Sequence, residues 1–184
     1  MPDKPHVYII LLRAIGPATH KRMSMAQWRE AAADAGFGAP ETLVNTGNMI
    51  ATHAGGPSDA AEAMTTVLRG FGLGDNVVPI VRTPGEMVGL IAADPISEAA
   101  SKRPAQTGVY FFLSDAPDLS WIGSHDGPET IHVVARHLVV DFSRDVAKSG
   151  RLIRRIDKSC GLNTARNWNT TRKLALKGAA RESE

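Results

Sequence analysis

The order of apolar runs and chain breakers in the first half of this sequence restricts the fold more than any other feature. His6–Leu12 is a short apolar run rich in β-favouring residues, which predicts a buried strand. Ser24 can cap the helix that follows, because apolar residues recur there at helical spacing up to Gly36, which ends it. The chain therefore begins with a strand and then a helix.

A hairpin and a second helix are predicted next. The runs Glu41–Asn45 and Met49–His53 favour strands, and the Thr-Gly-Asn sequence at 46–48 supplies the positive φ angle that a tight turn needs. Ser58 then begins a helix rich in Ala, Met and Leu, which ends near Gly70. These elements extend the order to strand, helix, hairpin, helix.

A fourth strand at Asn76–Thr83 completes the order βαββαβ. This is the order of the ferredoxin-like split βαβ unit, an antiparallel sheet with two helices on one face. A proline begins a short connecting helix at 84–93, and the polar, proline-bearing segment 94–106 predicts a lobe boundary. We therefore expect one lobe over residues 1–93 and a second over residues 94–184.

The second half of the chain repeats this pattern imperfectly. Three strands and a helix are predicted at Gly108–Leu113, Thr130–Ala135, Leu138–Phe142 and Arg151–Cys160. A final helix is expected from a cap at Asn163 or Thr164 to about Lys177. The predicted fold class is α+β, with two ferredoxin-like lobes, antiparallel sheets, and helices packed on one face of each sheet.

Composition narrows the class of protein. With 184 residues and 43% apolar content, the chain can fold without disulfides. Its one cysteine, Cys160, excludes an internal disulfide and cysteine-rich metal sites, and its place on an apolar helix face predicts a buried, inert thiol. The apolar run Val7–Leu12 is too short for a signal peptide or a membrane span. We expect a cytoplasmic protein with no membrane partner.

The sequence contains none of the common catalytic or cofactor motifs. The loop at 14–22 has neither GxGxxG nor GxxxxGK[ST], so no motif supports a nucleotide cofactor. HExxH and GxSxG are also absent, and His132 and His137 lie across a predicted hairpin rather than at metal-ligand spacing. We therefore predict no cofactor and no metal, and whether the chain is an enzyme stays open.

Charge is distributed unevenly along the chain. Residues 148–184 contain 10 Lys and Arg against 3 Asp and Glu, whereas the preceding residues are acidic overall. The helix expected at Arg151–Cys160 carries four cations at i, i+3, i+4 and i+7, opposite its apolar residues. These anion-binding candidates are Arg151, Arg154, Arg155 and Lys158. Such a face suits phosphate groups, and the alternative is an ordinary solvated helix face.

Four longer motifs resemble a known family. They read LLRAIGP, MSMAQWREAAADAGF, TLVNTGNMI and NTARNWNTTRKL, and together they are similar to the uncharacterised bacterial family called domain of unknown function 1697. The resemblance implies a pair of ferredoxin-like lobes and no established activity. The family's recurrent positions fall here on Trp168 and on eight residues that we take as ligand-binding candidates. These eight are Arg13, Thr46, Gly47, Asn48, Arg166, Asn167, Asn169 and Thr170. The loop Ala14–Thr19 departs from the family's pattern, so no role is carried over to it.

Three interpretations of function follow. The first is a binding module for an anionic partner, nucleic acid or a phosphorylated ligand, through the basic C-terminal helices. The second is a small-molecule binder or enzyme with a cleft between the lobes, lined by Arg13, Asn48, Arg166 and Asn167. In the third, these residues are purely structural and form a hairpin turn and a helix cap. The sequence leaves all three open.

Overall fold

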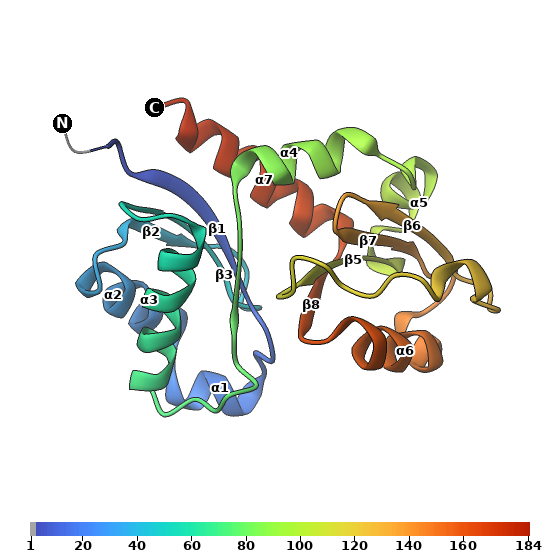
Figure 1. Cartoon of the computed structure of the whole chain (residues 1–184), viewed down its shortest axis with the longest axis horizontal. Coiled ribbons are helices and arrows are strands. Elements are labelled where there is room, and N and C mark those ends of the chain that lie inside the picture. Colours follow the sequence, from blue (N-terminus) through green and yellow to red (C-terminus); the bar gives the residue numbers. More distant parts are fainter. Residues whose placement is uncertain (1–2) are drawn as a thin grey trace. The chain divides into compact units, whose positions relative to one another are not determined.

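Two four-stranded antiparallel sheets form the framework of the computed structural model, which describes residues 3–184 (Figure 1). The chain divides into two compact units, one running up to Val88 together with Leu174–Glu184, and one comprising Gly89–Lys173. The predicted α+β class is therefore confirmed. The predicted division gave the whole final helix to the second lobe, whereas the contacts group its last turns with the first unit. None of the described helices has both the length and the apolar character needed to cross a membrane.

Unit 1 has the strand order β2-β3-β1-β4, with every neighbouring pair antiparallel. Its elements are β1 (His6–Leu12), α1 (Pro17–Arg22), α2 (Met25–Asp34), β2 (Gly38–Thr42), β3 (Asn48–His53), α3 (Pro57–Gly70) and β4 (Pro79–Arg82). The central strand β1 pairs Ile10 with Met49 of β3 on one side and with Val81 of β4 on the other. The predicted βαββαβ order is present, with α1 as an added helix.

Unit 2 has the strand order β6-β7-β5-β8, which is the topology of unit 1 with β5 in the central place of β1. Its elements are α5 (Ser97–Lys102), η1 (Pro104–Gln106), β5 (Thr107–Phe112), η2 (Ile122–Ser124), β6 (Thr130–Val134), β7 (His137–Asp141), η3 (Val146–Ser149), α6 (Gly150–Cys160) and β8 (Asn163–Arg166). The helices α4 (Pro84–Ala93) and α7 (Trp168–Glu182) have residues in both units. A long loop with the short η2 replaces the first helix of the repeat, because residues 113–129 are rich in turn-forming Asp, Ser, Gly and Pro.

The alternation of side chains along β1 determines the core of unit 1. Tyr8, Ile10 and Leu12 lie on the face that packs with Trp28 of α2 and Met64 of α3. The indole of Trp28 is fully buried and donates to the Met64 sulfur at 3.1 Å. This face of the sheet therefore holds the two helices that the split βαβ order predicts.

The last turns of α7 lie on the opposite face of the same sheet. A Cβ atom at Gly178 would lie 2.8 Å from Cδ1 of Ile9, which points away from the α2 and α3 side. Arg181 donates to the Ile50 carbonyl at 3.1 Å and to the Glu41 carboxylate at 2.8 Å. Unit 1 thus has helices on both faces of its sheet, where the sequence predicted them on one.

The start of the final helix was predicted wrongly. The expected cap residues Asn163 and Thr164 belong to the strand β8, which pairs with β5. The helix α7 begins at Trp168 instead, and Asn167 caps it, because its Oδ1 accepts from the Thr170 amide at 2.9 Å. The residues from Trp168 onward are helical, as their spacing predicted. The first four residues of the predicted helix form a strand instead, because they pair with β5.

Three other segments differ from expectation. The strand predicted at Glu41–Asn45 lies earlier, at Gly38–Thr42, since Val44 has a φ of +59° and leaves the extended conformation. The loop expected at 14–22 contains α1, and the polar boundary segment contains α5. The helices α1 and α5 have 6 residues each, which is too few for their periodicity to be recognised.

The contacts of α7 in unit 1 predict unequal effects for its two basic residues. Arg181→Ala should lower the free energy of unfolding by about 1–3 kcal/mol, because its side chain is 18% exposed and its backbone acceptors would be left unpaired. Lys177→Ala, the matched control, removes an exposed ion pair to the same Glu41 and should cost under about 1 kcal/mol. Urea denaturation measures both. Equal losses of unfolding free energy in the two variants would contradict the larger stabilising role that we assign to Arg181.

Candidate anion-binding site

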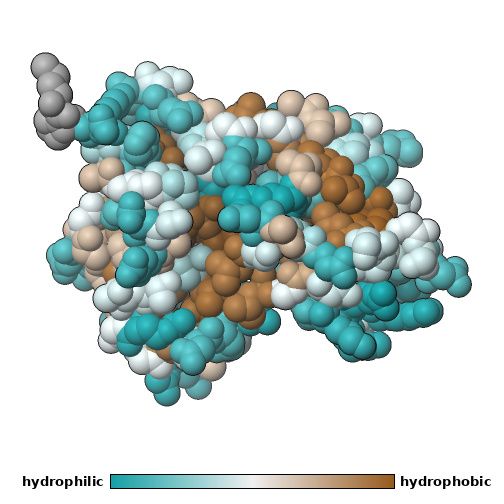
Figure 2. Space-filling view, viewed as in Figure 1, coloured by the Kyte–Doolittle hydropathy of each residue, from teal (hydrophilic) through white to brown (hydrophobic). Residues whose placement is uncertain are grey.

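The four cations predicted from helical spacing lie together on α6. The apolar residues Leu152, Ile156 and Cys160 are buried in the core of unit 2, where they pack with Tyr110 and Phe112 of β5. This packing turns the polar face outward, and the four cations are all exposed. Figure 2 shows a hydrophilic surface over α6. The helix therefore presents its cations to solvent as the sequence predicted.

The cations do not form a flat face but line a hollow of about 300 Å³ between α6 and the loop before β6. The hollow is lined by Arg151, Arg154, Arg155 and Lys158 from the helix, and by Trp121, Ser124, His125 and Asp126 from the loop. One carboxylate thus shares the hollow with four permanent cations. A concave surface of this charge concentrates anions more strongly than a flat one does.

Trp121 fixes the loop side of the hollow. Its side chain is buried, its indole donates to the Asp118 carbonyl at 2.9 Å, and the Arg155 guanidinium lies 5.6 Å from the ring centroid. Such a cation–π contact restricts the arginine without neutralising its charge. The same Asp118 carbonyl accepts from the Cys160 thiol at 3.4 Å. The loop and the helix are therefore joined at the base of the hollow.

Cys160 itself has the properties of a structural residue. It is buried, and burial raises the pKa of its thiol above the ordinary value. A thiol with a raised pKa is a poor nucleophile at neutral pH. The sequence-based prediction of a buried, inert cysteine agrees with this geometry.

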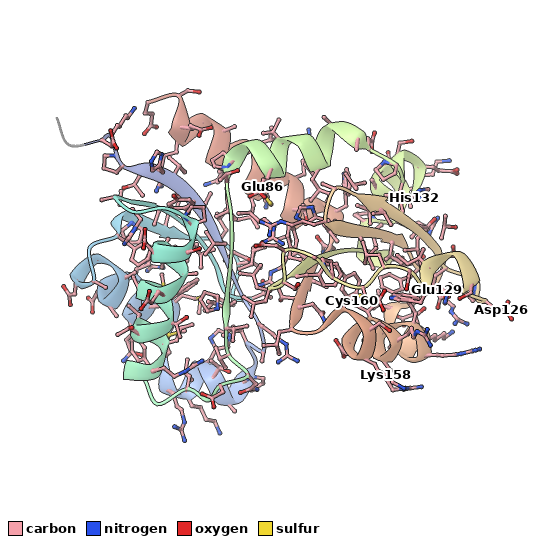
Figure 3. The ribbon with its side chains drawn as sticks, in the orientation of Figure 1. Glu86, Asp126, Glu129, His132, Lys158 and Cys160 are labelled. Carbon is pink, nitrogen blue, oxygen red and sulfur yellow. The ribbon has the colours of Figure 1, made fainter. Side chains whose placement is uncertain are left out.

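A histidine paired with a buried carboxylate lies at the edge of the hollow. His125 Nε2 is 3.1 Å from Glu129 Oε2, and the other oxygen of Glu129 is 3.7 Å from the Arg144 guanidinium. Burial alone would raise the pKa of Glu129, but hydrogen bonds to its carboxylate, with that of His125 among them, lower it below the ordinary value. Figure 3 shows Glu129 on the inner side of this loop and Asp126 at its outer end. Glu129 therefore remains ionised and orients the imidazole.

The Thr-Gly-Asn motif has a structural role in unit 1. Asn48 is fully buried, and its amide donates to the Leu43 carbonyl and to the Thr46 hydroxyl, both at 2.9 Å. Gly47 has a φ of +81°, and its carbonyl accepts from the Leu12 amide at 2.8 Å. These contacts fix the turn between β2 and β3 against the end of β1. The structural interpretation of this motif accounts for all three residue types.

Arg13 has a similar role beside the same strand end. Its guanidinium donates to the Asn76 carbonyl at 3.1 Å, and its amide donates to the Val78 carbonyl at 3.0 Å. These bonds attach the end of β1 to the segment that leads into β4. Arg13 does not line the α6 hollow.

The closing motif lies in unit 2. Arg166 is buried on β8, its guanidinium donates to the Thr164 hydroxyl at 2.5 Å and to the Ala165 carbonyl at 2.9 Å, and burial lowers its pKa to about 10. Asn167 is the helix cap described above, Asn169 is exposed and Thr170 is half-buried. Arg13 and Asn48 belong to unit 1, whereas Arg166 and Asn167 belong to unit 2. The predicted convergence of these four residues on one cleft therefore stays a prediction.

The sequence did not indicate the loop residues of the hollow. Trp121, Ser124, His125 and Asp126 lie in a segment without periodicity or a recognisable motif, and only the position of α6 relative to this loop brings them to the cations. The prediction therefore identified the helix side of the hollow and missed the loop side.

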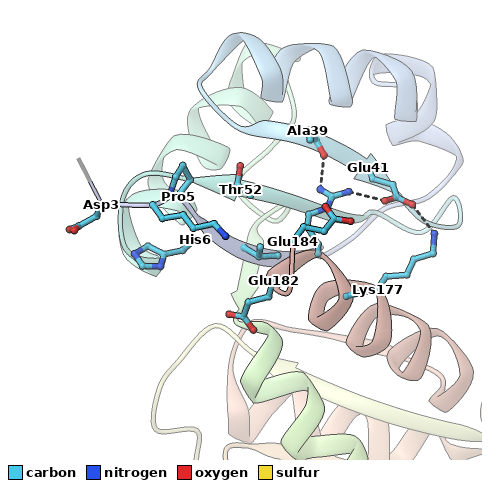
Figure 4. A pocket seen from close by; sticks show the side chains of 13 residues that line it. Asp3, Pro5, His6, Ala39, Glu41, Thr52, Lys177, Glu182 and Glu184 are labelled. Carbon is cyan, nitrogen blue, oxygen red and sulfur yellow. Dashed lines mark hydrogen bonds and ion pairs between the residues drawn. The ribbon is translucent and has the colours of Figure 1, made fainter. Parts of the chain in front are cut away.

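A larger hollow of about 760 Å³ lies in unit 1, between the start of β1, the strand β2 and the end of α7 (Figure 4). Its two α7 cations, Lys177 and Arg181, are both bound to Glu41 at 2.8 Å. Exposed carboxylates of Asp3, Glu182 and Glu184 also line it. Since its α7 cations are already neutralised, this hollow is a weaker anion site than the one at α6.

Comparison with known proteins gives a family and a fold. The family model described as "Protein of unknown function (DUF1697)" matches residues 6–138. No curated protein matches the chain. The solved structure of the conserved bacterial protein SP0830 from Streptococcus pneumoniae is similar over 96% of this chain and 99% of that one, with a TM-score of 0.75 and 16% identity. At this identity the likeness shows the fold alone. The closing motif lies outside the residues that the family model matches.

The turn at Gly47 gives a stability test of the structural interpretation. Gly47→Ala places a Cβ atom 2.8 Å from Leu12 Cβ and from Ile15 Cγ1 at a positive φ, so strain and overpacking add. Gly36→Ala is the control, because its φ is +98° but nothing lies within 4 Å. We expect a loss of about 1 kcal/mol for the control and about 1–3 kcal/mol more for Gly47→Ala, measured by urea denaturation. Equal losses would mean that the close packing around Gly47 contributes nothing.

Proposed function

Because this chain belongs to the DUF1697 family, whose function is unknown, its activity has to be inferred from its own site, and we propose that unit 2 binds a phosphate-bearing anion in the α6 hollow. One observation supports this most strongly. The four cations of α6 line one hollow. Among the described residues, no carboxylate forms an ion pair with any of them. An anion would supply the missing counter-charge.

Other arginines of this chain show what a structural role looks like. Arg103 binds the Asp141 carboxylate through two bonds of 2.9 and 3.0 Å, and Arg181 binds Glu41 and two carbonyls. Arg151, Arg154 and Lys158 have no such acceptor among the described contacts. Clustering like charges without partners is unfavourable, so a ligand that neutralises them gains binding energy.

A terminal phosphate suits these four cations better than a carboxylate does, because it carries up to about two negative charges and three acceptor oxygens. A guanidinium donates two parallel hydrogen bonds to phosphate oxygens, and three arginines with a lysine can surround all of the oxygens of a terminal phosphate. Both nucleic acids and phosphorylated metabolites carry this group. The group that these two classes of ligand share is phosphate. Probes that carry it on an RNA or on a small ester distinguish the two classes.

Binding can be tested with an RNA 12-mer that carries a 5′-phosphate and a 3′-fluorescein, followed by fluorescence anisotropy at two salt concentrations. We expect binding that weakens as salt rises. Arg151→Gln with Arg154→Gln should weaken it by about tenfold or more. The control is Arg172→Gln with Lys173→Gln, which removes two exposed charges of α7 outside the hollow and should change affinity by about twofold at most.

Two outcomes would contradict this proposal. If neither this RNA nor a small phosphate ester binds at low salt, the α6 hollow is not an anion site. An equal loss in the control variant would show that binding depends on net charge alone and not on this hollow.

A further inference from the structure

His125 and Glu129 form a polar pair at the edge of the α6 hollow, and both side chains are largely buried. The Glu129 side chain is 3% exposed, and it is held between His125 Nε2 at 3.1 Å and the Arg144 guanidinium at 3.7 Å. The loop packs closely around this pair, because a Cβ atom at Gly127 would lie 2.5 Å from Glu129 Oε2 and 2.9 Å from His125 Nε2. The imidazole is thus held in a fixed orientation by a buried carboxylate.

The pairing determines which ring nitrogen remains available. An ionised carboxylate can only accept a hydrogen bond, so Nε2 of His125 carries a proton and donates to Glu129. In the neutral ring the lone pair is then on Nδ1, and no described hydrogen bond uses that atom. Nδ1 can take up a proton and then donate to an oxygen of a bound anion.

Resting on the function proposed above, we infer that the α6 hollow takes a terminal phosphomonoester, and that His125 takes up one proton on Nδ1 when this ligand binds. The binding reaction is protein plus phosphate dianion plus one proton, giving a complex in which imidazolium donates to a phosphate oxygen. The one bond formed is Nδ1–H, whose proton comes from the solvent, and no bond of the ligand breaks. The ring becomes the fifth cation of the hollow, and the ligand's second negative charge compensates it.

The shape of the site favours a terminal phosphate over the backbone of a nucleic acid. The cations surround one hollow of about 300 Å³, which suits one compact dianion, whereas a backbone distributes single charges along a strand. Single-strand binders also need exposed aromatic rings on which bases stack. Trp121 is only 6% exposed and Arg155 covers its ring, so it offers no stacking surface.

The proton uptake has a defined pH dependence. The titratable and charged groups around His125 are Glu129, Asp126, Arg144, Arg151, Arg154, Arg155 and Lys158. The second proton of a phosphomonoester is lost near pH 6. Above about pH 7 the free ligand is therefore dianionic, and because the complex holds one proton more than its free components, affinity should fall by up to about tenfold per pH unit as pH rises.

The experiment is isothermal titration calorimetry of the full chain with phenyl phosphate, at pH 7.5, in two buffers that differ in their heat of ionisation. The difference in heat gives the number of protons taken up, and we expect about one. The diester methyl phenyl phosphate, which carries one charge and cannot become a dianion, should bind at least about tenfold more weakly. These two readouts use the unmodified protein, so they do not depend on a variant that folds.

A matched pair of variants then assigns the proton. His125→Gln should bind phenyl phosphate with no proton uptake and with little pH dependence, so that it is about tenfold weaker than the original chain at pH 6 and nearly equal above pH 8. His132→Gln is the control, because His132 lies on β6 and not at this hollow, and it should behave as the original chain.

The outcomes separate this inference from the proposed function. If the 5′-phosphorylated RNA binds through the α6 cations but phenyl phosphate does not, or binds no better than the diester, the inference is wrong and the proposed function stands. Proton uptake that persists in His125→Gln also overturns it. If no phosphate-bearing probe binds at all, both fail.

Discussion

The burial of the apolar side of α6 is the interaction on which the rest of the candidate site depends. Leu152, Ile156 and Cys160 pack against the β5 side of unit 2, and this fixes the rotation of the helix about its axis. Its cations must then point toward the loop at Trp121–Asp126. A hydrophobic contact with no role in recognition therefore decides that four positive charges meet in one hollow, and the loop only has to close its far side.

The recurrent motifs and the candidate site lie in different places. Gly47 and Asn48 fix a turn that joins three strands of unit 1, and Asn167 caps α7. Their residue types match the demands of a positive φ, of burial and of unpaired helix amides. The α6 hollow, in contrast, consists of exposed cations and a loop without a motif. The recurrent residues therefore have visible contacts that shape the fold, whereas the proposed site shows no such pattern.

Much of the fold could be predicted because its strands and helices are long enough to show their periodicity. The β1 strand, α2 with its Ser24 cap, and α6 with its two faces all appear as predicted. The failures have physical causes. Strand β8 at Asn163–Arg166 exists because β5 offers it a pairing edge, which no local pattern reveals. Likewise, His125 and Trp121 reach the cations only through tertiary packing, so the sequence indicated only the helix side of the candidate site.

The measurement that most directly tests where this protein binds its ligand is a backbone amide chemical-shift titration of the 15N-labelled chain with phenyl phosphate. The structure predicts shifts concentrated in two segments, residues 121–126 and 151–158, with the amides of Thr46, Gly47 and Asn48 unmoved. Shifts at Arg13 and at 46–48, with none on α6, would contradict the account and return the recurrent motif to the role of ligand site.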